Sequence, residues 1–169
     1  SESGPATDGL AGTMHRWFGG GAVSEAPQPG SSSERVVEAI LADVRKGRML
    51  ILVDDEDREN EGDLFVAASR ATPEAINFMP TEARGLVSLA LPEERMRALG
   101  LELITDDTGN TTRFGTAFAT PIDARQGVGS GMSAHDRART IAVAIADETR
   151  PADLVRPGRL LTLRAVDGG

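Results

Sequence analysis

The chain has 169 residues, 40% of them hydrophobic, and a formal net charge of −8, which suits one globular domain with its own core. It is acidic and has no basic run, so it is a poor candidate for nucleic-acid binding, which depends on clustered Lys and Arg. It has no cysteine for disulfides or thiolate metal sites and no long apolar run for a membrane helix or signal peptide, so we expect a soluble, cytoplasmic protein.

Residues 1–32 are poor in apolar side chains. They contain seven Gly, five Ser and three Pro, which is too little apolar surface to offset the entropy lost on ordering. We therefore expect a flexible tail followed by a single domain at 33–169. The run HRWF at 15–18 holds the only Trp of the chain, and it is either an idle apolar patch or a peptide that docks on a partner.

Apolar spacing and turn residues predict the elements of the first half of the domain. Apolar side chains recur at helical spacing between Ser33, an N-cap residue, and Gly47, which predicts an amphipathic helix. The elements expected next are a buried strand at 49–53, an acidic loop at 54–63, a strand from Leu64 to Ala68, a helix from Thr72-Pro73-Glu74 to Met79, a strand at 85–91 and a helix opened by Pro92.

The second half continues the alternation of helices and strands. We expect a polar loop at 105–113, a strand from Phe114 to Thr120, a helix opened by a capping box of Ser133 and Asp136, a turn at Arg156-Pro157-Gly158 and a last strand at 159–166. Interleaved strands and helices favour an α/β or α+β layered domain.

The acidic loop, DDEDRENEGD at 54–63, holds seven carboxylates and one arginine. Two carboxylates 4 Å apart repel by about 4 kcal/mol near a protein surface, so the side chains must spread or hold a cation. Oxygen ligands suit Mg²⁺ or Ca²⁺. An EF-hand calcium loop that begins at Asp57 is excluded, because its twelfth position should hold a glutamate ligand and is occupied by Ala68. Arg58 could then hold an anionic substrate; the alternative is a solvated turn in which Arg58 pairs locally.

Several motifs, in order along the chain, resemble those of the 3,4-dihydroxy-2-butanone 4-phosphate synthase family. They are VDDEDRENEGD at 53–63, RGLVSLAL at 84–91, AFATPIDAR at 117–125, SGMSAHDRARTI at 130–141 and Arg156-Pro157-Gly158. The resemblance covers residues 34–169. It implies that family's fold, a homodimer, and a lyase that converts ribulose 5-phosphate to a four-carbon ketose phosphate and formate in riboflavin biosynthesis.

The resemblance also assigns roles to individual residues. It implies that Arg58 and Glu59 contact the substrate, that Glu59 is a ligand of Mg²⁺ or Mn²⁺, and that Asp63 is a further substrate contact with a catalytic role. Glu61 is then the acid/base group, because a carboxylate can remove a carbon-bound proton beside a carbonyl that the metal polarises.

Two further predictions fall in the SGMSAHDRARTI segment. Arg137 and Thr140 orient the substrate or brace the loop beside it. His135 either takes part in metal or proton chemistry or is a surface or cap residue.

The chain departs from the family pattern at other positions. Arg159 stands where the family has an essential histidine after R-P-G, Ser88 replaces a frequent cysteine, and His135 replaces a small residue. An arginine does not release its proton as an imidazole does; Arg159 could instead pair with the acidic loop and replace the charge of the metal.

The chain stops before the family's G-H-T-E-A segment, so we expect the C-terminal portion of the fold, with its second metal ligand and phosphate-binding loop, to be absent. Two alternatives to the synthase therefore stay open. One is a diverged relative acting on another sugar-like phosphorylated substrate, and the other is a non-catalytic module that binds a partner or a metal.

Overall fold

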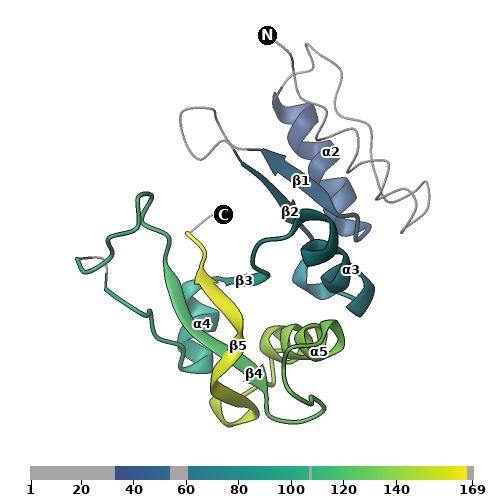
Figure 1. Cartoon of the computed structure of the whole chain (residues 1–169). Coiled ribbons are helices and arrows are strands. Elements are labelled where there is room, and N and C mark those ends of the chain that lie inside the picture. The colour runs from purple at the N-terminus through teal and green to yellow at the C-terminus, as the bar shows by residue number, and fades with distance from the viewer. Residues whose placement is uncertain (1–32, 54–60, 107, 167–169) are drawn as a thin grey trace. The chain divides into compact units, whose positions relative to one another are not determined.

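The computed structural model describes residues 33–53, 61–106 and 108–166, and it divides into two compact units. Of the described residues, the first unit contains those up to Arg70 together with 81–84, and the second contains 71–80 and those from Gly85 onward. Each unit has its own small sheet, with α2 (Ser33–Arg45) in the first unit and several helices in the second (Figure 1). The mixed α/β class predicted from the sequence is confirmed, whereas the flexible tail at 1–32 lies outside the described residues.

The first unit consists of a helix and a β-hairpin. Helix α2 (Ser33–Arg45) confirms the predicted amphipathic helix and is followed by β1 (Leu50–Val53), β2 (Gly62–Phe65) and a 3₁₀ turn (Ala68–Arg70). Strand β1 pairs antiparallel with β2. Beyond the end of α2, Arg48 forms an ion pair of 2.7 Å with the buried Asp43, which ties the helix to the segment that enters β1.

Two predictions in the first unit were wrong in detail. The second strand begins at Gly62 and ends at Phe65, earlier than expected, because backbone pairing with β1 extends into the acidic segment. Strand β1 was predicted to be buried, but Leu52 and Val53 are 45% and 67% exposed. Among the described residues β1 pairs with one strand only, and a two-stranded ribbon cannot bury both of its faces.

The second unit holds a three-stranded sheet in the order β3-β5-β4. Its elements are α3 (Pro73–Phe78), β3 (Ser88–Leu91), α4 (Glu93–Leu99), β4 (Phe118–Ala124), α5 (Ala134–Ile145), a 3₁₀ turn (Pro151–Asp153) and β5 (Leu154–Arg164). A π-helical turn (Met79–Ala83) follows α3, and its residues are divided between the two units. The central strand β5 is parallel to β3 and antiparallel to β4. The largest fully buried apolar side chains are those of Ile76, Phe78, Leu99, Ile122, Leu154 and Leu160.

The starts of α3 and α5 have the predicted side-chain caps, but the predicted capping box of α5 is only half formed, because the Asp136 carboxylate binds the loop before the helix rather than the Ser133 N–H. Thr72 accepts a hydrogen bond of 3.2 Å from the Ala75 N–H, with Pro73 in the first turn of α3. Ser133 accepts one of 3.0 Å from the Asp136 N–H at the start of α5. Side chains of this kind satisfy backbone donors that have no partner within the helix, so local sequence determines where α3 and α5 begin.

The predicted strands of the second unit needed larger corrections. Strand β3 begins at Ser88 rather than Gly85, and β4 runs from Phe118 rather than Phe114. The expected turn at 156–158 lies inside β5, as a bulge between the pairs Asp123–Val155 and Ile122–Leu160, and the Arg156–Pro157 peptide is cis. A Cβ atom on Gly158 would overlap the backbone of β4, so this glycine permits a close approach of two strands.

Arginine side chains bind the backbone carbonyls at the ends of several elements in the second unit. Arg95 of α4 donates from Nε to the Ala144 carbonyl at 2.8 Å and from Nη2 to the Ala146 carbonyl, at the C-terminal end of α5. Such carbonyls lack partners within the helix and carry its negative dipole end, so a cation there is favourable. Arg95 therefore connects α4 with the end of α5.

We predict that Arg95→Met lowers the free energy of unfolding by about 1–3 kcal/mol, because charge-assisted hydrogen bonds to the last turn of α5 are lost. Urea unfolding followed by circular dichroism measures this change. Arg97→Gln is the matched control, since the Arg97 side chain forms only an exposed i,i+4 pair with Glu93 within the described residues, and such a pair is worth about 0.3–0.5 kcal/mol. Equal losses in both variants would contradict the role assigned to Arg95.

Candidate active site

The structure places the predicted site residues in two separate groups. Glu61 and Asp63 are exposed and flank Gly62 at the start of β2 in the first unit, where Asp63 is a strand residue opposite Leu52 rather than a loop residue. Arg137 and Thr140 lie on α5 in the second unit. Arg58 and Glu59, the predicted substrate contacts and metal ligand, lie outside the described residues.

The second unit contains a glycine loop, residues 127–131, that leads into α5. The buried carboxylate of Asp136 accepts hydrogen bonds of 3.0 Å from the Gly129 N–H and 2.9 Å from the Gly131 N–H. Asp136 is therefore more than a helix-start residue, because its side chain also fixes the loop. The Gly129 N–H is the largest cause of a lowered pKa for Asp136, and the other nearby donors and His135 add to it while burial opposes them.

A second buried carboxylate, Asp123 of β4, lies against the same loop. Its Oδ1 accepts from the backbone N–H of Arg159 at 3.0 Å, and its Oδ2 forms an ion pair of 2.8 Å with the Arg159 guanidinium. A Cβ atom on Gly131 would lie 2.6 Å from both carboxylate oxygens. The loop, the end of β4 and the bulge of β5 thus meet at one carboxylate.

Arg159 has a carboxylate partner within the described residues, and the pairing with the acidic loop that the sequence suggested falls largely outside them. It pairs with Asp123, while residues 54–60 of the acidic loop lie outside the described part of the chain. The Asp123 side chain is only 5% exposed, whereas that of Arg159 is 53% exposed. A buried carboxylate is thus neutralised by a cation that is itself about half exposed.

Asp123 was not predicted as a site residue. It lies in the AFATPIDAR segment as a single acid directly after the apolar Ile122 in a strand. An ionised side chain at such a position needs a cationic partner, and that requirement was the available signal. The partner, Arg159, is distant in sequence, and the strand pairing that brings it close could not be read from either segment alone.

Thr140 and Arg137 differ in how their polar atoms are satisfied. Thr140 is fully buried, donates to the Asp136 carbonyl at 2.9 Å and accepts from the Ala124 N–H at 3.0 Å. These bonds hold α5 against β4, so they favour a structural role for Thr140 over a direct contact with substrate. The Nε–H of Arg137 is buried and has no hydrogen-bond acceptor in the described part of the chain, so Arg137 is the better candidate for contact with an anionic group.

The metal chemistry expected from the sequence rests on the first unit. The exposed carboxylates Glu61 and Asp63 supply oxygen ligands, which are the type that Mg²⁺ takes. Within the described ranges no group of three or more His, Asp or Glu side chains is arranged to hold a metal ion. His135 is exposed at the start of α5. No helix in these ranges is long and apolar enough to cross a membrane.

Known proteins resemble the chain over most of its length. Residues 38–169 match the family model described as 3,4-dihydroxy-2-butanone 4-phosphate synthase. A protein of that name from Pseudomonas syringae pv. tomato is 51% identical over 133 residues, which cover 79% of this chain and 36% of the relative. Another protein of that name, from Shewanella sediminis, is 46% identical over 140 residues, which cover 83% of this chain and 63% of the relative. The chain thus spans less than two thirds of either relative.

Solved structures of proteins with the same name have a similar fold. A two-domain 3,4-dihydroxy-2-butanone 4-phosphate synthase from A. baumannii has a TM-score of 0.72 and 48% identity, covering 79% of this chain and 38% of that protein. A 3,4-dihydroxy-2-butanone 4-phosphate synthase in complex with two magnesium ions has a TM-score of 0.74 and 36% identity, and the match covers 79% of this chain and 61% of that protein.

We predict that Gly131→Ala destabilises the second unit by about 2–4 kcal/mol, because the new methyl group would meet the Asp123 carboxylate in a backbone conformation unfavourable to alanine. Gly131 has a φ of +79°. Gly115→Ala is the matched control, since Gly115 has a φ of +69° and open space around its Cβ position; it should lose only about 1 kcal/mol. A thermal unfolding series distinguishes the two, and equal losses would contradict the contact.

We predict that Asp136→Asn reduces the loss of stability in acid. A folded-state pKa below the ordinary value of 3.8 means that the ionised carboxylate stabilises the fold above this pH. That contribution is lost as the pH falls through the lowered folded-state pKa. Urea unfolding at pH values on both sides of 3.8 should show a shallower acid decline for Asp136→Asn, and parallel declines would disprove the linkage.

Proposed function

Because the chain belongs to the 3,4-dihydroxy-2-butanone 4-phosphate synthase family, we propose that it is a lyase of riboflavin biosynthesis that converts ribulose 5-phosphate to 3,4-dihydroxy-2-butanone 4-phosphate and formate. The observation that carries this proposal is the match over residues 38–169, which includes the complete run R-E-N-E-G-D at 58–63. We also propose that the protein acts in the cytoplasm and binds neither nucleic acid nor membranes.

The residues of the first unit have chemistry suited to this reaction. We assign Arg58, Glu59 and Asp63 to substrate binding, since a guanidinium can hold a phosphate or hydroxyl and carboxylates can accept from sugar hydroxyls. Glu61 is the proposed general base that removes a carbon-bound proton to give an enediol, and Asp63, two residues further on, assists in proton transfer.

Oxygen ligands in this segment fit Mg²⁺, with Mn²⁺ as the other candidate, and Glu59 is the proposed ligand. When bound, the metal polarises the carbonyl and the neighbouring hydroxyl of the sugar. The magnesium complex of a solved relative supports this choice of cation.

The proposed roles in the second unit follow its hydrogen bonds. Arg137 is the proposed anion contact, because its buried Nε–H lacks an acceptor in the described residues. Thr140 is the positioning residue, because its hydroxyl links α5 to the end of β4. We further propose a homodimer. The exposed apolar side chains Leu52, Val53 and Phe65 of the first unit support a protein contact there.

A second candidate function is the same enediol chemistry on another sugar-like phosphorylated substrate. The ion pair of Arg159 with the buried Asp123 favours it, because an arginine held by a carboxylate offers a permanent charge where the family resemblance implies a titrating histidine. A non-catalytic module that binds a metal or a partner remains as the third hypothesis.

We predict that the purified chain with Mg²⁺ releases formate and the four-carbon phosphate from carbon-13-labelled ribulose 5-phosphate, as followed by NMR. Glu61→Gln should lower kcat by about 10²–10⁴-fold, the usual size of a general-base contribution. Glu59→Gln should weaken Mg²⁺ binding, which calorimetry measures. Glu38→Gln, which makes the same chemical change at an exposed position of α2, should alter neither.

The possible failures of this experiment have different meanings. A folded chain that binds Mg²⁺ but does not turn over ribulose 5-phosphate would favour the second candidate function, and labelled phosphorylated sugars would then be screened. Unchanged Mg²⁺ affinity in Glu59→Gln would remove the metal assignment, and no binding of either metal or substrate would leave the non-catalytic hypothesis.

A further inference from the structure

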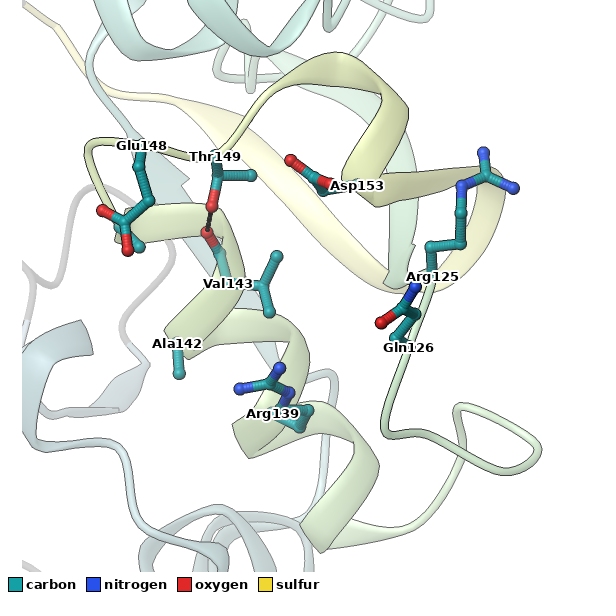
Figure 2. A pocket seen from close by; sticks show the side chains of 9 residues that line it. Arg125, Gln126, Arg139, Ala142, Val143, Glu148, Thr149 and Asp153 are labelled. Carbon is teal, nitrogen blue, oxygen red and sulfur yellow. Dashed lines mark hydrogen bonds between the residues drawn. The ribbon is translucent and has the colours of Figure 1, made fainter.

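The second unit has a cavity of about 300 Å³ beside the C-terminal half of α5, which we call the α5 groove (Figure 2). Its floor consists of Ala142, Val143 and Ala146, which share one helix face with Arg139 through spacings of three and four residues. The opposite wall includes Arg125 and Asp153. None of these residues belongs to the proposed synthase site.

Hydrogen bonds hold the walls of the α5 groove in place. Thr149, in the segment after α5, donates from its hydroxyl to the Val143 carbonyl at 2.6 Å, as drawn in Figure 2. Arg125 donates to the Leu154 carbonyl at 2.9 Å, and Asp153 accepts from the Arg150 N–H at 2.8 Å. The groove is thus formed before any ligand arrives, which reduces the entropy lost on binding.

The groove carries an unpartnered charge of each sign. The Arg139 side chain lies over the glycine loop, where a Cβ atom on Gly127 would be 3.2 Å from its Nε. Arg139 on α5 and Glu148 beyond the end of that helix line the groove at separate points, as Figure 2 shows. Neither side chain has a hydrogen-bond or ion-pair partner within the described ranges, so both charges are available to a ligand.

We propose that the α5 groove binds a small zwitterion of the ω-amino acid class, with its anionic group on Arg139, its ammonium group on Glu148 and a short apolar body over Ala142, Val143 and Ala146. A ligand with one charge would leave either Arg139 or Glu148 without a partner. The volume is at the lower end of the range for small-molecule sites, about 300–1,000 Å³, which fits a molecule of this size.

The test is an NMR titration of the nitrogen-15-labelled chain with 6-aminohexanoate. Saturable shifts of the Ala142, Val143 and Ala146 amides are expected, with a Kd on the order of 1–10 mM for a ligand of this size. Hexanoate and hexylamine, which each lack one charge, should bind at least about 3-fold more weakly, as expected for the loss of one exposed ion pair. Hexanoate or hexylamine binding as tightly as 6-aminohexanoate would overturn the proposal.

Charge reversal tests the two contacts without relying on loss of binding alone. Arg139→Glu and Glu148→Arg should each weaken binding of 6-aminohexanoate, and the double variant should restore it, because the zwitterion can bind in the reverse direction. Arg97→Glu, an exposed reversal on α4, is the matched control and should leave binding unchanged. A double variant that keeps the native pattern of amide shifts but binds no better than the single variants would disprove the paired assignment, as would the absence of saturable shifts in the unmodified chain.

Discussion

The buried carboxylate of Asp123 is the interaction on which the second unit most depends. An ionised group in that position needs both charge neutralisation and hydrogen bonds, and Arg159 supplies both from its guanidinium and its own backbone N–H. Arg159 lies within the bulge of β5, where Gly158 also comes against β4. Gly131 leaves room for the carboxylate from the other side. The bulge of β5 and two of the glycines therefore all adjoin this one charged residue.

The glycine loop connects this carboxylate to α5. Asp136 receives two of the loop N–H groups, and Thr140, one helical turn later, links the backbone of Asp136 to that of Ala124 beside Asp123. The start of α5 is thus fixed to the end of β4 through short, buried contacts. Any substrate contact made by Arg137, which lies between Asp136 and Thr140 in sequence, would rest on a rigid segment, as precise positioning requires.

The sequence was sufficient where structure is determined locally. Thr72 with Pro73, and Ser133 before Asp136, mark helix starts through side-chain bonds to residues three positions away. It was insufficient where pairing between segments distant in sequence determines the local structure. The R-P-G run has the composition of a turn, but pairing with β4 places it inside β5; the acidic run has the composition of a loop, but β1 draws Gly62 and Asp63 into a strand.

The same distinction applies to the candidate site. Residue roles in the R-E-N-E-G-D run came from a resemblance, and part of that run lies outside the described residues. The Asp123–Arg159 pair depends on two segments 36 residues apart, so neither segment reveals it. The two roles of Asp136 show the intermediate case, since its helix-start bond is local and was predicted, whereas its bonds to Gly129 and Gly131 depend on how the loop folds back.

Helix α5 is held at both ends by different chemistry, and this explains why its exposed face is free. At its start Asp136 and Thr140 use carboxylate and hydroxyl bonds, and at its end Arg95 binds the last carbonyls. The side chains of Arg139, Ala142, Val143 and Ala146 take part in neither attachment, because Arg95 binds backbone carbonyls only. A ligand in the α5 groove would therefore contact a helix whose position is already determined, so its binding would cost little reorganisation of the protein. Because the start of the same helix carries Arg137 and Thr140, the groove and the proposed synthase chemistry share one rigid element without sharing a side chain.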